Sequence, residues 1–207
     1  IEIVVVNDGG MEIEDVLSSS GREKNVIHIK HRSNKGLAAA RNSGIESARG
    51  KYIAYLDDDD LYYPEHIEIL VSFLKSNDYC IAYTDAYRAH QGFRKGKYVV
   101  RKRDVPYSFD FDPDRFLTDN YIPVLCIMHE KSCVDRAGRF DEELTSLEDW
   151  DLWIRMSRLY KFGHIKKITC EFSWRHDATS MTSARRVDFL RNTKLMYERY
   201  KNLASNR

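Results

Sequence analysis

The chain has 207 residues, of which 43% are hydrophobic and 31% are charged, and its formal net charge is +1. This length is that of one domain with a substantial core, and the near-balanced charge excludes a general electrostatic attraction for nucleic acid. The sequence contains no apolar run of about 18 residues and no signal peptide, so it has no transmembrane segment.

The first half alternates between predicted strands and predicted helices. Apolar, β-branched runs predict strands at 2–6, 26–31 and 51–56. Helices are predicted at 12–20, 37–48 and 64–76. Gly50 is expected to cap the second helix in a left-handed conformation. This alternation predicts an α/β fold with a doubly wound, mostly parallel sheet, in which ligands bind beyond the carboxyl ends of the strands.

The second half is more irregular. Strands are predicted at 80–87, 98–103, 124–129 and 164–174, and helices at 112–119, 147–160 and 185–200. No internal repeat and no low-complexity linker divides the chain, so we expect a single domain over 1–207.

Four consecutive carboxylates, Asp57–Asp60, directly follow the third predicted strand. Four ionised aspartates repel one another, and their oxygens are the ligands that Mg²⁺ and Mn²⁺ prefer. In an extended segment Asp57 and Asp59 would point one way, and Asp58 and Asp60 the other. Asp8 follows the first strand, so it is expected to share a crevice with this cluster. Taken alone, however, such a run is more typical of a solvated loop.

Two other uses of an acidic run fail on single residues. A calcium-binding loop that began at Asp57 would need glycine at its sixth position, where this sequence has Tyr62. A phosphatase of the haloacid dehalogenase type would need Thr or Val at Leu61 and a later Gly-Asp pair, which the sequence lacks.

Four motifs follow one another along the chain. They are Val4-Val5-Val6-Asn7-Asp8-Gly9-Gly10, Asn34-Lys35-Gly36 with Ala40-Arg41-Asn42, Leu56–Asp60 with Pro64, and Gly138–Leu144 leading to Leu147–Trp153. In this order they resemble the inverting family 2 glycosyltransferases, which have a nucleotide-diphospho-sugar transferase fold. The resemblance extends from Ile1 to about Thr182, and it predicts that fold here.

The resemblance assigns the acidic run to the family's D-x-D motif. It implies that Asp59 ligates a Mn²⁺ or Mg²⁺ cofactor bridging the two donor phosphates, and that Asp57 and Asp58 contact the donor. Such a metal neutralises the charge that develops on the leaving diphosphate. Two overlapping D-x-D frames fit Asp57–Asp60, so the register stays open.

The remaining donor contacts are expected near the start of the helix predicted at 37–48. By resemblance, Asp8 binds the donor base or ribose. Lys35 and Gly36 stand where a helix N-terminus presents free N–H groups to a phosphate. Arg41 is predicted either to approach the nucleotide or to be a solvated helix charge.

The acceptor side is expected at the helix that starts near residue 147. By resemblance, Asp149 is the catalytic base that takes the proton of the acceptor hydroxyl, whereas Glu148 is explained by the helix dipole alone. Trp150 is expected to face the acceptor sugar or to pack in the core. His176 matches a histidine that reaches the metal or the diphosphate in the family.

The sequence thus predicts a metal-dependent inverting glycosyltransferase that moves a sugar from a nucleotide-sugar donor, with UDP favoured, to a carbohydrate or lipid-linked acceptor. Residues 1–78 would form the nucleotide-binding part, 79–182 the acceptor-side part and 183–207 a C-terminal helix. The alternative is a non-catalytic domain of the same fold that binds nucleotide or carbohydrate.

Two further features bear on context. The four cysteines, Cys80, Cys126, Cys133 and Cys170, have no regular spacing, which favours free thiols in the cytoplasm, with a place at the inner membrane face left open. The chain begins at Ile1 within a predicted strand, and the family's first strand–helix unit is absent from these residues. This indicates a fragment of a longer protein or a truncated, inactive domain.

Overall fold

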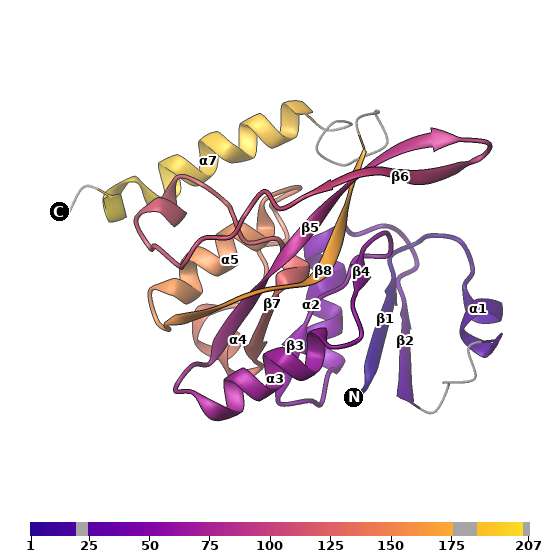
Figure 1. Cartoon of the computed structure of the whole chain (residues 1–207), viewed down its shortest axis with the longest axis horizontal. Coiled ribbons are helices and arrows are strands. Elements are labelled where there is room, and N and C mark those ends of the chain that lie inside the picture. Colours follow the sequence, from indigo (N-terminus) through magenta and orange to yellow (C-terminus); the bar gives the residue numbers. More distant parts are fainter. Residues whose placement is uncertain (20–24, 176–185, 205–207) are drawn as a thin grey trace.

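The computed structural model describes residues 1–19, 25–175 and 186–204. Its N-terminal part is a two-stranded parallel sheet of β1 (Ile3–Asn7) and β2 (Val26–Lys30), connected through the short helix α1 (Glu14–Ser19). Helix α2 (Leu37–Ser47) packs against this sheet at Gly44, where an added Cβ would lie 3.7 Å from Val6 (Figure 1).

The second sheet holds six strands in the order β3-β7-β5-β8-β4, with β6 paired to β5. The strands are β3 (Tyr52–Ala54), β4 (Leu61–Tyr62), β5 (Ile81–Arg94), β6 (Lys97–Asp104), β7 (Ile127–Glu130) and β8 (Phe162–Arg175). Only β5 and β8 pair in parallel; the other pairs are antiparallel. The α/β class is therefore confirmed, but the larger sheet is mixed rather than mostly parallel.

The prediction that the first three strands belong to one sheet is wrong. β1 pairs with β2 and β3 pairs with β7, so no strand ladder joins β1 to β3. The link between the two sheets here is a side chain: the Glu2 carboxylate accepts hydrogen bonds from the backbone N–H groups of Arg49 and Gly50. Gly50 has no positive φ, so the expected left-handed cap is also absent; α2 ends at Ser47 and Ala48 is extended.

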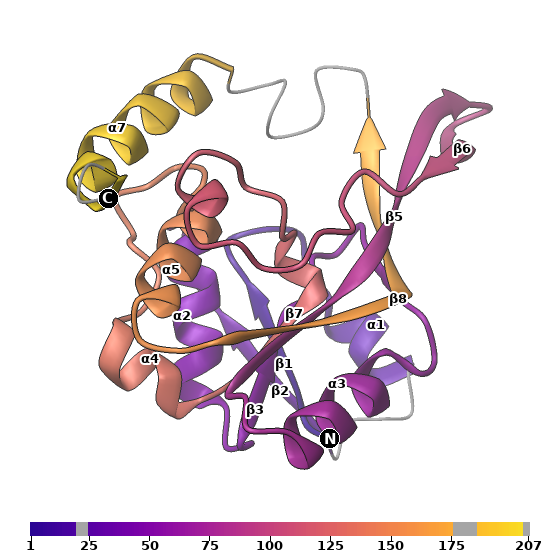
Figure 2. The same cartoon turned by 60° about the vertical axis from the view of Figure 1, so that its left-hand side comes forward.

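Helices cover both faces of the larger sheet (Figure 2). Because side chains alternate along a strand, Ala82 of β5 and Met128 of β7 pack against Leu70 and Leu74 of α3 (His66–Ser76). Their neighbours along β5 and β7 point to the opposite face, into the main core. That core includes α5 (Glu148–Ser157), whose Trp153 is fully buried.

The part of the chain that the structure describes also has α4 (Ser132–Ala137), α7 (Arg186–Ala204) and the 3-10 turns Arg115–Leu117 and Val124–Cys126. The first turn takes the place of the longer helix expected at 112–119; the Asp112 carboxylate caps it by accepting from the N–H groups of Asp114 and Arg115. Within the described ranges, no helix is long and apolar enough to cross a membrane.

Candidate active site

The loop after β1 is joined to the start of α2 through the Asp8 carboxylate. Its Oδ1 accepts hydrogen bonds from Nδ1–H of His31 (2.6 Å) and the N–H of Lys35 (2.9 Å), and its Oδ2 accepts from the N–H of Gly36 (2.8 Å). Burial raises the pKa of Asp8, but these hydrogen bonds outweigh it and the pKa is lowered. Asp8 therefore holds the 34–36 loop in place, while its contact with a donor stays a prediction.

Gly9 permits this close approach of the two loops. Its φ is +76°, and an added Cβ would lie 2.6 Å from the backbone nitrogen of Asn34. We expect Gly9→Ala to lower the free energy of unfolding by roughly 2–4 kcal/mol, because it adds a backbone clash to the cost of a left-handed residue. Gly96→Ala is the matched control, since Gly96 has φ +81° but open space around it. Urea unfolding that gave equal losses for the two variants would contradict the clash.

The acidic run is a turn and not an extended strand end. The N–H of Asp60 donates to the carbonyl of Asp57 (3.2 Å), so the expected alternation of the four side chains is wrong. Asp60 accepts from the N–H of Ser173 on β8 (2.9 Å), and burial raises the pKa of Asp60 to about 7. Asp60 therefore anchors the turn, while the side chains of Asp58 and Asp59 are exposed.

Arg175 at the end of β8 approaches the same turn. Its Nη2 lies 3.2 Å from Oδ2 of Asp59, and its guanidinium lies 4.4 Å from the ring centre of Tyr98 on β6. Burial raises the pKa of Asp59, the Arg175 charge opposes this, and Asp57 and Asp58 add to it. Asp59 is thus paired with one cation, Arg175, while the charges of Asp57 and Asp58 repel it.

Arg41 of α2 joins the acidic turn to the start of α5. Its Nη2 donates to both carboxylate oxygens of Asp57 (3.0 and 3.1 Å), and its Nη1 donates to Oε1 of Glu148 (2.5 Å). The Arg41 side chain is 8% exposed. It is neither a solvated charge nor free to reach a nucleotide, and it brings two distant parts of the sequence into one site.

The start of α5 is held in a strained conformation. Leu147, immediately before the helix, has φ +64°, which a branched side chain rarely adopts. Glu148 is buried against Arg41, whereas Asp149 is partly exposed and accepts from the N–H of Trp150 (2.7 Å). The strained residue therefore lies directly before Glu148 and Asp149, the two acids of the fourth motif.

Both acids hold a proton more readily than usual. Burial and the Asp149 charge raise the pKa of Glu148 to about 7, with Arg41 opposing them. Burial also raises the pKa of Asp149, again opposed by Arg41. A carboxylate with a raised pKa is a stronger base, which suits the acceptance of a proton.

Other predicted residues lie elsewhere. Trp150 is 3% exposed and donates to the carbonyl of Phe116 (2.7 Å), so it is a core residue and not an acceptor platform. Lys35 belongs to the 34–36 loop, and its side chain is exposed. His176 lies outside the described residues.

Sequence reasoning missed three residues that organise the site. His31 contacts both Asp8 and Ser43, and Arg175 contacts Asp59. Asp151 is fully buried, accepts from Arg155, Arg199 and Tyr200, and ties α7 to α5. Asp151 comes two residues after Asp149, and residues two apart do not share a face of a helix. This spacing is the only sequence signal that Asp151 faces away from the site.

The acidic turn fits a metal that is held jointly with a ligand. Among the described residues, no three His, Cys, Asp or Glu side chains gather as a complete metal site. Mg²⁺ is commonly bound by one or two carboxylates together with substrate phosphates. Exposed Asp58 and Asp59 match that donor set and leave positions for a diphosphate.

Comparison with known proteins decides the family. A profile described as glycosyl transferase family 2 matches residues 1–136. The chain belongs to glycosyl transferase family 2. It is 33% identical over 166 residues to an uncharacterized glycosyltransferase of Rickettsia felis, covering 80% of this chain, and 29% identical over 170 residues to the uncharacterized glycosyltransferase YwdF of Bacillus subtilis, covering 82%.

The fold of this family 2 chain is also that of a solved structure. S. aureus TarS in complex with UDP-GlcNAc is similar with a TM-score of 0.68 at 16% identity, covering 94% of this chain and 57% of that one. The chain spans 27% of the Rickettsia felis relative and 60% of YwdF, so it matches only part of each relative's length.

Proposed function

We propose that this domain transfers a sugar, with inversion, from a UDP-linked donor to a hydroxyl acceptor on a carbohydrate or a lipid-linked carbohydrate. The observation that carries the proposal is the position of Arg41, which pairs with Asp57 of the acidic turn and with Glu148 next to Asp149. Donor-side and acceptor-side acids thereby lie in one site. Family membership and the UDP-GlcNAc complex of TarS support the choice of donor.

Each group has a chemical task in this proposal. The turn at Asp57–Asp60 receives the donor beside α2, to which Arg41 joins it. Asp149 accepts the acceptor's proton while the hydroxyl attacks the anomeric carbon from the face opposite the diphosphate. Arg41 fixes Asp57 and Glu148, and its charge limits the rise in the pKa of Asp149. A bound Mn²⁺ or Mg²⁺ would neutralise charge on the diphosphate.

Metal dependence can be tested by donor binding alone. We expect UDP to bind at least tenfold more tightly with Mn²⁺ than with EDTA, because two phosphates near several carboxylates need a cation. Asp59→Ala should abolish the difference by removing a ligand. Glu68→Ala is a control for an exposed acid outside the turn. Calorimetry that gave equal UDP affinity with and without metal would refute the assignment of Asp59.

The alternative function is that of a binding protein: a non-catalytic domain that binds nucleotide or carbohydrate. Slow hydrolysis of UDP-sugars by the full-length protein with Mn²⁺ separates the two, since hydrolysis uses the donor site and water in place of the acceptor.

The four free thiols fit a cytoplasmic protein, as the Sγ atoms of Cys126 and Cys170 lie 3.7 Å apart without a disulfide.

A further inference from the structure

A β-hairpin of unusual charge projects from the larger sheet. Strands β5 and β6 are joined at Lys95 and Gly96, whose φ values of +50° and +81° match a tight hairpin turn. Among the described residues, the last β8 partner of β5 is Arg175, opposite Gln91, and the hairpin continues beyond this pair. Figures 1 and 2 show it extending away from the body of the molecule.

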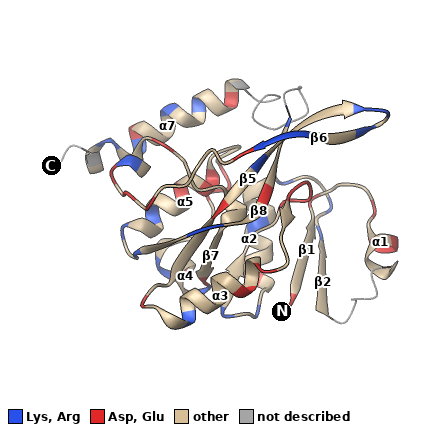
Figure 3. Cartoon of the chain, viewed as in Figure 1, with Lys and Arg blue, Asp and Glu red and all other residues tan. Residues whose placement is uncertain are grey.

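The hairpin concentrates positive charge, although the formal net charge of the whole chain is only +1 (Figure 3). Between residues 88 and 104 the basic side chains are Arg88, Arg94, Lys95, Lys97, Arg101, Lys102 and Arg103, and the one acid is Asp104. Arg88 pairs with Asp104 and Arg103 with Glu171. No carboxylate in the described parts of the chain pairs with the other five, and all five are exposed.

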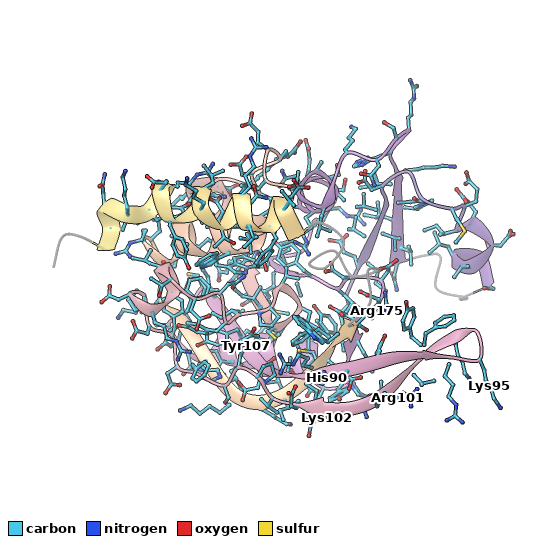
Figure 4. All side chains as sticks on the ribbon, turned by 90° about the horizontal axis from the view of Figure 1, so that it is seen from above. His90, Lys95, Arg101, Lys102, Tyr107 and Arg175 are labelled. Atoms are coloured by element: carbon cyan, nitrogen blue, oxygen red, sulfur yellow. The ribbon has the colours of Figure 1, made fainter. Side chains whose placement is uncertain are left out.

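Strand register places most of these charges on one face. Arg94 is opposite Lys97, and Lys102 is opposite His90 on the same face. The register shift near His90 leaves Arg101 as the extra residue of β6, and its side chain lies over Gly92, whose added Cβ would be 3.0 Å from Nε of Arg101. In Figure 4, His90 and Lys102 lie near the root of the hairpin, Arg101 lies further out, and Lys95 is at the tip.

The other face of the hairpin is apolar near the tip and is connected to the active site at the root. Phe93, 61% exposed, packs edge-on against Tyr98 at 5.2 Å. Tyr98 in turn lies under Arg175, which pairs with Asp59. An exposed aromatic side chain beside several unpaired cations is the composition of segments that settle at the surface of an anionic bilayer.

Helix α7 presents a second surface at the same end of the molecule. Both α7 and the hairpin lie at the top of Figures 1 and 2, which are related by a turn about the vertical axis. Val187 and Leu190 of α7 are 80% and 60% exposed, whereas Tyr197 faces the body of the molecule, since its hydroxyl donates to the carbonyl of Thr118 and its ring packs against Trp150. Two separate elements at one end thus offer apolar contacts, and the hairpin adds the charge.

We propose that the β5–β6 hairpin, together with the outer face of α7, docks the protein on a membrane surface rich in anionic lipid. The tip of the hairpin points at the membrane, so that Phe93 enters the headgroup region from one face of the hairpin, and the five basic side chains reach the lipid phosphates from the other face and from the tip. The purpose of this docking rests on the proposed function, since it would bring a lipid-linked acceptor to the site next to Arg175. The binding itself does not depend on UDP.

The test is sedimentation of the full-length protein with vesicles. We expect binding to vesicles of equal parts phosphatidylcholine and phosphatidylglycerol and none to pure phosphatidylcholine, with a strong decrease at high salt. The triple variant Lys97→Gln, Arg101→Gln, Lys102→Gln should bind roughly 10²-fold more weakly. The matched control removes three exposed charges elsewhere, with Lys75→Gln, Arg158→Gln and Lys161→Gln, and should bind normally.

A second variant separates apolar insertion from charge. Phe93→Ser should weaken vesicle binding roughly tenfold while leaving its salt dependence unchanged. Equal binding to both vesicles, no binding, or an unaffected triple variant would overturn the proposal. Tight binding of soluble polyphosphate without vesicle binding, or self-association that Phe93→Ser abolishes, would instead assign the hairpin to a polyanion or to a second copy. Normal vesicle binding by a protein that does not bind UDP would reject the proposed function alone.

Discussion

Asp149→Asn is expected to reduce sugar transfer by ~10²–10⁴-fold, the usual contribution of a general base. Asparagine keeps the shape of the side chain and can still accept the hydrogen bond from the N–H of Trp150, so the start of α5 should be preserved. It cannot take a proton from the acceptor. Because the base contacts the acceptor and not the nucleotide, the affinity for UDP should stay within about twofold.

Glu148→Gln is the neighbouring comparison. Glu148 is buried against Arg41, so its replacement should affect stability and only mildly affect turnover. Initial rates with saturating donor, together with UDP affinity measured by calorimetry, distinguish the two variants. An Asp149→Asn variant with near-normal turnover would show that the base lies elsewhere.

The sequence predicted elements well where periodicity and local chemistry agree. The β-branched residues before Asp8 form β1, and the amphipathic pattern after Leu147 forms α5. Strand pairing was not predictable in the same way. β3 pairs with β7, more than 70 residues away, and nothing local in Tyr52–Ala54 specifies an antiparallel partner.

The acidic turn shows the same division between local and long-range information. Four adjacent like charges predict a ligand site only together with the other motifs, because such a run alone is more typical of a solvated loop. That Asp60 is an anchor depends on Ser173, and that Asp57 is bound depends on Arg41. Each side chain's role within the run is therefore set by elements far along the chain, which a local pattern does not contain.

Arg41→Met is expected to lower the free energy of unfolding by ~3–5 kcal/mol at pH 8, the usual cost of removing one partner from a buried ion pair. The variant leaves Asp57 and Glu148 without their guanidinium, and Glu148 is 4% exposed. Arg49→Met is the matched control. Arg49 also pairs with a carboxylate, Glu2, but its side chain is 80% exposed, and such pairs contribute ~0–1 kcal/mol.

The loss in Arg41→Met should depend on pH in a definite direction. In the wild type, the pKa of Glu148 is raised to about 7, above its value in the unfolded chain, so its contribution is most favourable at low pH and is lost as pH rises through 7. Removing Arg41 takes away the charge that opposes this rise, so the pKa of Glu148 climbs further. The difference in stability between wild type and variant should therefore be smaller at pH 5 than at pH 8. Urea unfolding at the two pH values measures it, and a loss equal to that of Arg49→Met at pH 8 would show that the Arg41 pairs do not hold the site together.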